Sequence, residues 1–567
     1  MVEKKYEQTF DIHVALKVIK HISSGIYRDI AGALKELVMN SFDSQATEVE
    51  VATGFPSFDT ITVSDNGRGM TEEMFEIAFK NVGLSMKSIH REWYPASNGR
   101  TIIGMFGIGF LSAAHISTDL RIQTFPIDQD YGLDVTLNLQ PYFDYMDQLS
   151  TVDEFKMGTI GYNRVPRNGH ASGTIVTLRN VGKSKQSRFH SVISADGERL
   201  IAWPEKGAKE AHPGQSMKRF TERLEGSPDI VSVRKLCGQE QVLWQLGLTC
   251  PVEYLDEGPI LKEYERIVPE PALKIIRELK DKAKKFKFHL WYDGIQVRKP
   301  ILLPTPKVRR TYVDELDLDA EVDVKVFPID IAGKSVNGKE VQATGYLFFQ
   351  PNRIAPAEIR GLYPRLHGIG IGGNYDKSGL LLQLKAENPI FRVSMSGELY
   401  IESGLVDSLN LDRSGFMEVD PEFKFLDDQV FKKLSSGPDS IISEARKTSV
   451  KRRRRRTSAK RKAEAQGHLA DLEHDLKKAG IPYTPLFPDG ALEDMASELG
   501  PGQIAYPSVG SPAVVIDHSK GLVFVDEGME QNEVYAIIAI VDHLLGSTTN
   551  PQKARKEFAA LLSHVIG

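Results

Sequence analysis

Three short motifs within the first 110 residues constrain this chain more than any other feature. They are Glu36-Leu-Val-Met-Asn40, Asp65-Asn-Gly-Arg-Gly69 and Gly104-Met-Phe-Gly107-Ile-Gly109. The first places a carboxylate four residues from an amide, the second carries a strand-end aspartate into a glycine turn, and the third is a glycine-rich loop. A pocket for a phosphorylated nucleotide needs such parts. Their order therefore predicts a nucleotide site.

The first motif lies in a predicted helix over residues 28–43. Glu36 and Asn40 share one face, with Asp43 near it, because they are one helical turn apart. An amide oxygen is a hard ligand for Mg²⁺, and a carboxylate can polarise a water molecule. Taken alone, the pair is more typical of a solvated helix face. Apolar residues at helical spacing form the opposite stripe: Ile30, Leu34, Leu37 and Val38.

The second motif follows residues 59–64, which alternate polar and apolar and so predict a half-buried strand. Asp65 at its end can accept a hydrogen bond from an exocyclic amine such as that of adenine. Gly67 and Gly69 would let the backbone approach a planar base closely. Taken alone, this motif is more typical of an ordinary turn before a helix.

The third motif exposes successive backbone N–H groups, which suit phosphate oxygens. It is neither a Walker loop nor a dinucleotide-binding fingerprint. Lys87, in the polar segment before it, is positioned in the sequence to meet a phosphate. The glycines and the polar segment predict a mobile lid over residues 83–109, and the competing interpretation is a surface loop. A fourth segment, residues 172–178, predicts a strand with Thr174 near its start.

Together the four segments resemble the GHKL ATPase superfamily, which includes gyrase B, the heat shock protein 90 chaperones, histidine kinases and MutL. The glycine-rich loop is most similar to that of heat shock protein 90. The resemblance implies an α/β fold of the α+β sandwich kind, the Bergerat ATP-binding fold, with ATP and Mg²⁺ as cofactors. It assigns Glu36 as the general base, Asn40 as the Mg²⁺ ligand and Asp65 as the adenine reader. Other residues that it places at the nucleotide are Asp43, Gly67, Gly69, Met70, Lys87, Gly104, Phe106, Gly107, Gly109, Phe110 and Thr174.

The resemblance continues into the segment 405–413, which is similar to a middle-domain segment of heat shock protein 90 that supplies an arginine to the γ-phosphate. Arg413 would take that catalytic role, although Asp412 stands where the family usually has serine. A guanidinium delivered from a second domain suits charge stabilisation in phosphoryl transfer. The alternatives are that Arg413 is a plain surface arginine, or that Gln350 or a nearby cation such as Arg353 takes this role instead.

Composition predicts a globular protein with several domains. The 567 residues carry a net charge of −5, which gives no global attraction to nucleic acid or to membranes. Only Cys237 and Cys250 occur, so we expect a reducing compartment without a disulfide framework. The N-terminal residues show no apolar targeting core, and no apolar run reaches membrane length. A cytoplasmic location without membrane contact is the resulting expectation.

Four regions follow from the patterns along the chain. We expect the ATPase domain over 1–245, an α/β middle domain of the transducer type over 246–435, a basic linker or helix over 436–465, and a small α/β domain over 466–567 that pairs two chains. Within the middle domain, the glycine-rich segment 362–373 indicates a tight turn, with a second backbone-binding loop as the alternative.

The segment 446–462 contains 11 Lys or Arg and no acid. Such a run is typical of a solvated linker or exposed helix, but it also suits contact with the phosphates of DNA or RNA. The arginines that would make such contacts are Arg452, Arg453, Arg454, Arg455 and Arg456.

The sequence thus predicts an ATP-hydrolysing clamp that works as a homodimer and acts on a protein client, as the chaperones do. The alternative is a nucleic-acid-linked ATPase resembling MutL or the MORC proteins, in DNA repair or genome defence. A binding module without turnover is disfavoured because Glu36 is present.

Overall fold

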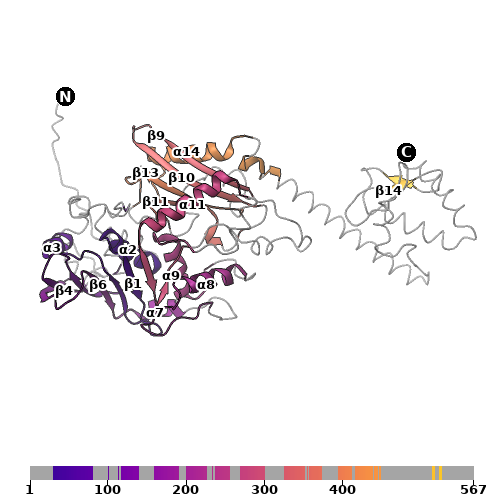
Figure 1. Ribbon diagram of the computed structural model, residues 1–567. Helices are drawn as coiled ribbons and strands as arrows, with labels where there is room; N and C mark the ends of the chain where they lie inside the picture. Colours follow the sequence, from indigo (N-terminus) through magenta and orange to yellow (C-terminus); the bar gives the residue numbers. More distant parts are fainter. Residues whose placement is uncertain are drawn as a thin grey trace, which may run out of the picture. The chain divides into compact units, whose positions relative to one another are not determined.

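A computed structural model describes residues 30–80, 100, 113, 116–138, 159–190, 200–226, 233, 236–255, 268–299, 325–350, 354, 357–372, 394–410, 415–437, 440–444, 446–447, 514–516 and 523–525. The chain divides into two compact units, residues 1–445 and 446–567. The predicted site residues that the structure describes all lie in the first unit, which contains two mixed sheets (Figure 1).

The first sheet has eight strands in the order β5-β4-β3-β6-β2-β1-β7-β8. Burial alternates along β2, where Ile61 and Val63 are buried while Thr62 and Ser64 are half-buried. This is the period-2 pattern of a strand with one face on the core. The bounds are β1 Glu48–Ala52, β2 Ile61–Asp65, β3 Asp119–Phe125, β4 Tyr131–Asn138, β5 Thr159–Pro166, β6 Gly173–Arg179, β7 His289–Tyr292 and β8 Ile295–Gln296.

Among the described residues, five helices belong to this part of the chain. They are α2 Ile30–Asp43, α3 Glu72–Lys80, α7 Lys183–His190, α8 Gln215–Gly226 and α9 Gly238–Thr249. Helix α2 buries the predicted apolar stripe completely, and it packs against α9 and β2. Because most helical stability in proteins comes from packing an apolar face, this stripe accounts for the position of α2.

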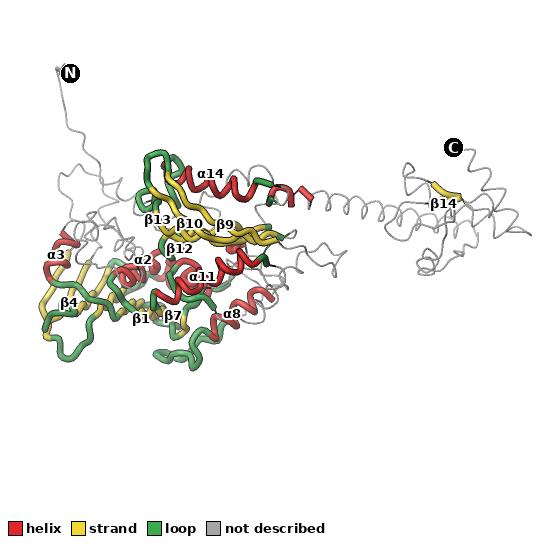
Figure 2. Tube along the Cα trace, turned by 45° about the horizontal axis from the view of Figure 1, so that its top comes forward, coloured by secondary structure: helices red, strands yellow, loops and turns green. Residues whose placement is uncertain are grey.

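The second sheet has five strands in the order β12-β11-β13-β10-β9. Two helices pack on β9 and β10, and Figure 2 shows α14 on one side of the sheet and α11 on the other. In both views α2 and α11 lie between the two sheets, and Figure 1 shows α9 beside α2. The bounds are α11 Glu270–Lys285, β9 Lys325–Lys334, β10 Glu340–Phe349, η4 Ala357–Ile359, β11 Gly361–Leu366, β12 Ile369–Gly370, β13 Met395–Ser403 and α14 Pro421–Ser435.

Strand β1 connects parts of the first sheet that are far apart in the sequence. It pairs antiparallel with β2 and parallel with β7, which lies about 240 residues later. Beyond the ladder, Thr53 donates to the Asp293 carboxylate through its backbone N–H over 2.7 Å and through Oγ1 over 2.6 Å. The predicted boundary at 245 therefore falls inside α9, and two strands of the first sheet lie beyond it.

Several predicted elements appear in the structure close to their expected places. The helix over 28–43 corresponds to α2, and the strands over 59–64 and 172–178 correspond to β2 and β6. The glycine-rich segment forms the β11–β12 hairpin, in which His367 and Gly368 turn the chain with φ of 49° and 89°. The mixed α/β architecture agrees with the predicted fold class.

In the second unit the structure describes two short antiparallel strands, β14 Val514–Ile516 and β15 Val523–Val525. The rest of the predicted C-terminal domain lies outside the described residues. Among the helices that the structure describes, none is both long and apolar enough to cross a membrane.

Candidate nucleotide-binding site

The carboxylate of Asp65 is the centre of a hydrogen-bonded cluster at the end of β2. Ser41 Oγ donates to its Oδ2 over 2.8 Å, and the backbone N–H groups of Gly67 and Thr174 donate to Oδ1 over 2.8 and 3.3 Å. Burial raises the pKa of Asp65, while these three hydrogen bonds oppose that rise. An ionised carboxylate offers about four acceptor positions, so three donors leave room for a further N–H donor from a ligand.

Thr174 reaches Asp65 because the two residues are direct partners across the antiparallel β2–β6 ladder. On the other side of β6, Thr174 pairs with Thr124 of β3, and their Oγ1 atoms lie 3.0 Å apart. Thr124 Oγ1 also accepts the backbone N–H of Met70 over 2.8 Å. The structure thus brings the second motif and the fourth segment together on three neighbouring strands.

Two glycines allow the backbone to pack closely around this cluster. Gly69 has a φ of +67°, and a Cβ there would lie 2.3 Å from the carbonyl oxygen of Phe125. Gly173 has a φ of +147°, and a Cβ there would lie 2.0 Å from the carbonyl oxygen of Asp65. Both positions therefore require glycine for the protein's own packing.

The first motif lies on α2 as predicted, but it does not form a solvated face. Glu36 is only 6% exposed and Asp43 only 3%, while Asn40 is half-buried. Ser41, directly after Asn40, bonds Asp65, so it links α2 to the end of β2. A buried carboxylate one helical turn from a half-buried amide, on a helix tied to Asp65, fits the donor set that Mg²⁺ and a nucleotide require.

Arg100 is a buried residue that the sequence analysis did not single out. Its guanidinium donates to the carbonyls of Ala46 over 2.7 Å and Phe286 over 2.6 Å, and it lies over the Phe42 ring at 4.6 Å. Burial lowers the pKa of Arg100 to about 10, and the neighbouring Asp43 opposes that shift. Arg100 thus joins the chain following α2 to the end of α11.

Ser41 and Thr124 are two further residues of the Asp65 cluster that the sequence patterns did not indicate. A lone hydroxyl in a helix or strand is too common to signal a site, although the place of Ser41 beside Asn40 was visible in the sequence. Nothing within the sequence of β3 distinguishes Thr124, since its importance comes from the pairing of β3 with β6.

The remaining predicted site residues lie outside the described part of the chain. They are Lys87, Gly104, Phe106, Gly107, Gly109, Phe110, Arg413 and Arg452 to Arg456. Arg353, the rival to Arg413, also lies there. Gln350 is described, and it is fully buried with its backbone N–H bonded to the carbonyl of Ser394 over 3.0 Å.

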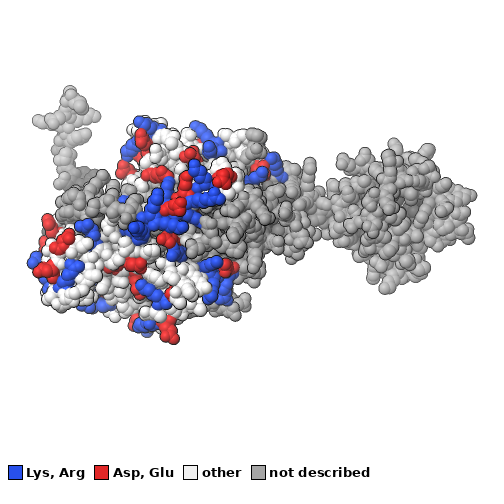
Figure 3. All heavy atoms as spheres, viewed as in Figure 1, with Lys and Arg blue, Asp and Glu red and all other residues white. Residues whose placement is uncertain are grey.

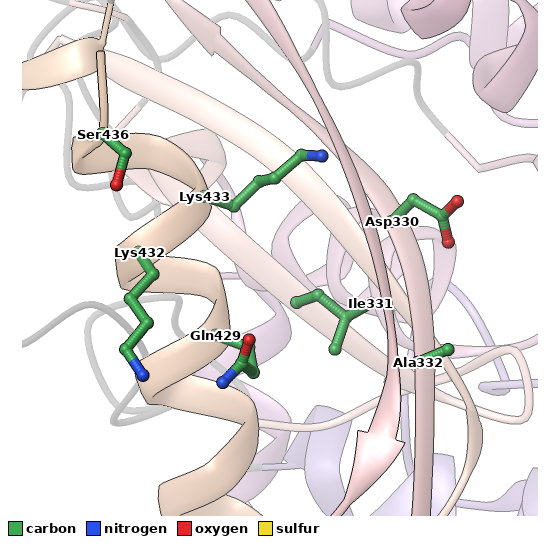
Figure 4. Close-up of a pocket in the computed structure, with 7 residues that line it drawn as sticks. All are labelled: Asp330, Ile331, Ala332, Gln429, Lys432, Lys433 and Ser436. Atoms are coloured by element: carbon green, nitrogen blue, oxygen red, sulfur yellow. The ribbon is translucent and has the colours of Figure 1, made fainter.

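A surface groove of about 370 Å³ lies elsewhere, between β9 and α14 (Figure 4). Its lining residues are Asp330, Ile331, Ala332, Gln429, Lys432, Lys433 and Ser436. None of the predicted nucleotide residues lines it. Within the described ranges, no group of three or more His, Cys, Asp or Glu is placed to hold a metal ion.

Residues 27–142 match a family model described as histidine kinase-, DNA gyrase B-, and HSP90-like ATPase. Over 152 residues the chain is 34% identical to the chaperone protein HtpG of Francisella tularensis subsp. novicida, a match that covers 23% of each protein.

Two further relatives carry names that refer to DNA-related proteins. A putative type II restriction enzyme, HgiDII of Herpetosiphon aurantiacus, is 32% identical over 115 residues, which are 20% of this chain and 17% of that protein. The DNA mismatch repair protein MutL of Leptospira biflexa is 36% identical over 69 residues, which are 12% and 11% of the two chains. The matched segments thus span less than a quarter of these curated relatives.

The matched region 27–142 contains α2, β2 and β3, and with them Glu36, Asn40 and Asp65. The motifs, the mixed sheet that carries them and the family match all agree. The N-terminal part of this chain therefore carries an ATPase domain of the GHKL superfamily, the group that includes histidine kinases, DNA gyrase B and the HSP90 chaperones.

Proposed function

We propose that this chain binds ATP with Mg²⁺ and hydrolyses it to ADP and phosphate. The supporting observation is the cluster around Asp65, in which Ser41 from α2 and Thr174 from β6 hold one half-buried carboxylate with room for a further donor. The exocyclic amine of adenine is such a donor. A base without that amine would leave the remaining acceptor position of the carboxylate desolvated and unfilled, so the cluster also suits discrimination.

In this proposal α2 supplies the hydrolytic groups. Glu36 acts as the general base for the attacking water, and Asn40 ligates the Mg²⁺ that neutralises phosphate charge. Asp43, Gly67, Gly69, Met70 and Thr174 line the nucleotide from the described part of the chain. Lys87, the loop 104–110 and Arg413 complete the site from outside it. Catalysis is then mainly positioning and electrostatic stabilisation, as in other phosphoryl transfers.

We further propose that ATP binding drives closure of a homodimer in a chaperone-like cycle in the cytoplasm. The relatives named HtpG support this form of the proposal, since they match over the longest segment reported above. The clamp's client would be another protein. The second sheet, whose strand β12 packs on α9, is the element that would relay the closure.

A nucleic-acid-linked role is the second candidate. The relatives named as MutL and as a restriction enzyme favour it, as does the basic run 446–462. Figure 3 also shows Lys and Arg side chains along α11, whose last turn holds Lys282, Lys284 and Lys285. Basic residues also suit the negative end of a helix. The α11 lysines are therefore weaker support than the relatives.

The first experiment tests hydrolysis. Glu36→Ala should abolish turnover of ATP while leaving its affinity, measured by calorimetry with Mg²⁺, within about threefold of the wild-type value. Exposed Glu205→Ala is the matched control and should behave as the wild-type protein does. Normal turnover by Glu36→Ala would refute the assigned base, and wild-type protein that binds no ATP would refute the proposed function.

The second experiment separates the two roles. Duplex DNA should raise the ATPase rate only if the nucleic-acid role holds. That stimulation should weaken steeply with salt and disappear when Arg452 to Arg456 become glutamine. No effect of DNA or RNA at low salt, together with stimulation by an unfolded protein, would select the chaperone-like role. Arg413→Ala should slow turnover in either case, and an unchanged rate would remove Arg413 from the site.

A further inference from the structure

Lys35, the residue before Glu36 on α2, is a buried lysine directed at the second sheet. It is only 7% exposed, and its Nζ donates to the carbonyl oxygen of Gly370 on β12 over 2.8 Å. Burying an ammonium group is unfavourable unless the charge is well bonded. The burial of Lys35 therefore depends on its hydrogen bond to Gly370 and not on apolar packing alone.

The acceptor lies on a hairpin that is held firmly. Gly370 packs so closely on the end of α9 that a Cβ there would lie 3.0 Å from Thr249 Cα and 2.7 Å from the Tyr363 ring. The hairpin's turn at His367 and Gly368 adopts positive φ angles. The packing against α9 and the tight turn therefore hold the Gly370 carbonyl, which accepts the hydrogen bond from Lys35, in a fixed position.

A buried ion pair fastens the same hairpin to the rest of the second sheet. Arg365 of β11 donates to Glu398 of β13 over 2.5 Å and to the carbonyl of Leu248 in α9 over 2.7 Å. Tyr254 donates its hydroxyl to the other oxygen of Glu398 over 2.5 Å. Arg365 and Glu398 are each 1% exposed. Breaking a buried pair of this kind is costly, so the hairpin and sheet move as one element.

We propose that Lys35 is a positioning residue that couples the second sheet to the catalytic carboxylate. This inference rests on the proposed ATPase function. The Lys35–Gly370 bond fixes α2 relative to the hairpin, and Glu36 is the next residue on the same rigid helix. A shift of the hairpin therefore shifts Glu36 relative to the bound phosphates. By thermodynamic linkage, a nucleotide that fixes the position of α2 also fixes the position of the hairpin.

Asp65 stands on β2, where Ser41, Gly67 and Thr174 hold its carboxylate, whereas Lys35 bonds the β11–β12 hairpin. Loss of the Lys35 bond should therefore affect the placement of the general base and not the capture of adenine. That separation gives the proposal a kinetic signature, a fall in kcat without a matching rise in KM.

The first arm measures steady-state turnover of Mg·ATP by the full chain. Lys35→Met keeps the apolar stem but removes the donor, and kcat should fall by about ten- to a hundredfold, since small misplacements have effects of that size. KM and the calorimetric Kd should stay within about threefold. Lys35→Arg, which retains charge and donors, should recover most of the rate. Lys280→Met is the matched control because Lys280 is equally buried, at 7%, but lies on α11.

The second arm measures hydrogen exchange at the amides of residues 361–370, with and without Mg²⁺ and a non-hydrolysable ATP analogue. In the wild-type protein the analogue should slow exchange in this hairpin. In Lys35→Met the analogue should still bind but the slowing should be lost. If Lys35→Met does not fold, Lys35→Gln, whose shorter amide does not span the same distance, takes its place.

Wild-type kcat in Lys35→Met would overturn the inference. An equal loss of rate in Lys35→Met and Lys280→Met, without recovery in Lys35→Arg, would also overturn it because it would indicate general destabilisation. Failure of the wild-type protein to bind the analogue would instead refute the proposed function, and the inference with it. The calorimetric titration of the wild-type protein distinguishes the two kinds of failure.

Discussion

Asp65 and Thr174 face each other across the β2–β6 ladder, and the backbone N–H of Thr174 donates to the Asp65 carboxylate over 3.3 Å. The two residues are 109 positions apart in the chain. Their register is fixed by the pairing of two central strands, so the geometry of this carboxylate depends on the sheet and not on a flexible loop. A binding group held in this way loses little freedom when a ligand arrives.

We expect Asp65→Asn to abolish detectable ATP binding without unfolding the protein. The amide has nearly the same shape, but it presents an N–H donor where the adenine amine also donates. Calorimetry with Mg·ATP measures the loss, and circular dichroism checks the fold. Asp128→Asn, at an aspartate whose side chain is 80% exposed, is the control and should bind normally. Retained affinity in Asp65→Asn would mean that adenine lies elsewhere.

Binding of ATP should weaken at acidic pH, beginning above the pH expected for an ordinary aspartate. Burial raises the pKa of Asp65 above 3.8, and the protonated carboxyl is a poorer acceptor. The folded state also binds more protons than the unfolded chain between those two pKa values, so the Asp65 contribution to stability falls as pH rises through that window. Kd values for ATP measured at a series of pH values between about 4 and 8 test the predicted loss of binding at acidic pH.

Ser41→Ala should move that acid limb to higher pH. The hydrogen bond from Ser41 lowers the pKa of Asp65, so its removal lets burial raise that pKa further. At neutral pH the lost bond should weaken ATP binding by about 1 kcal/mol, or roughly fivefold in Kd. Ser57→Ala, at an exposed serine in the loop before β2, is the control. An acid limb that does not move would show that Ser41 is not bonded to the carboxylate.

Gly173→Ala should destabilise the fold by about 3 kcal/mol, since the new Cβ meets the Asp65 carbonyl and the backbone φ is unfavourable for alanine. Gly161→Ala on β5 is the matched control because a Cβ there meets no atom within 4 Å. Its effect should stay within about 0.5 kcal/mol. Denaturant unfolding of the two variants provides the comparison, and equal stability would contradict the close approach of β6 to β2.

Arg100→Lys should cost about 3 kcal/mol of unfolding free energy. A lysine has no planar fork, so it cannot satisfy the carbonyls of Ala46 and Phe286 together. Arg164→Lys is the control, because Arg164 is 62% exposed and pairs with Glu72 at the surface. Surface ion pairs of this kind contribute little to stability, so this variant should unfold much as the wild-type protein does. Thermal unfolding measures both variants.

Local patterns in the sequence predicted the elements that carry the site. The apolar stripe of α2 and the alternation of β2 and β6 are nearest-neighbour features, so they could be recognised without knowing the fold. The motif order also identified the superfamily, which the family match over 27–142 confirms. The roles assigned to Glu36 and Asn40 stay predictions.

Long-range contacts were beyond the reach of such patterns. The carbonyls that Arg100 binds lie up to 187 residues away, and Lys35 meets a carbonyl 335 residues away. Charge and hydropathy both predict that Lys35 faces solvent. Its Nζ instead bonds Gly370 of the β11–β12 hairpin, which packs on α9. The sequence could not indicate that pairing because backbone carbonyls leave no trace in side-chain patterns.

The parallel pairing of β1 with β7 has a practical consequence for anyone who wishes to express the nucleotide-binding part alone. A fragment ending at residue 245 would remove β7, truncate α9 and leave the backbone of β1 open along its length. Open strand edges recruit other chains, so such a fragment should aggregate. Extending the fragment to residue 299 would keep both the neighbouring strand and the partner of Thr53, Asp293.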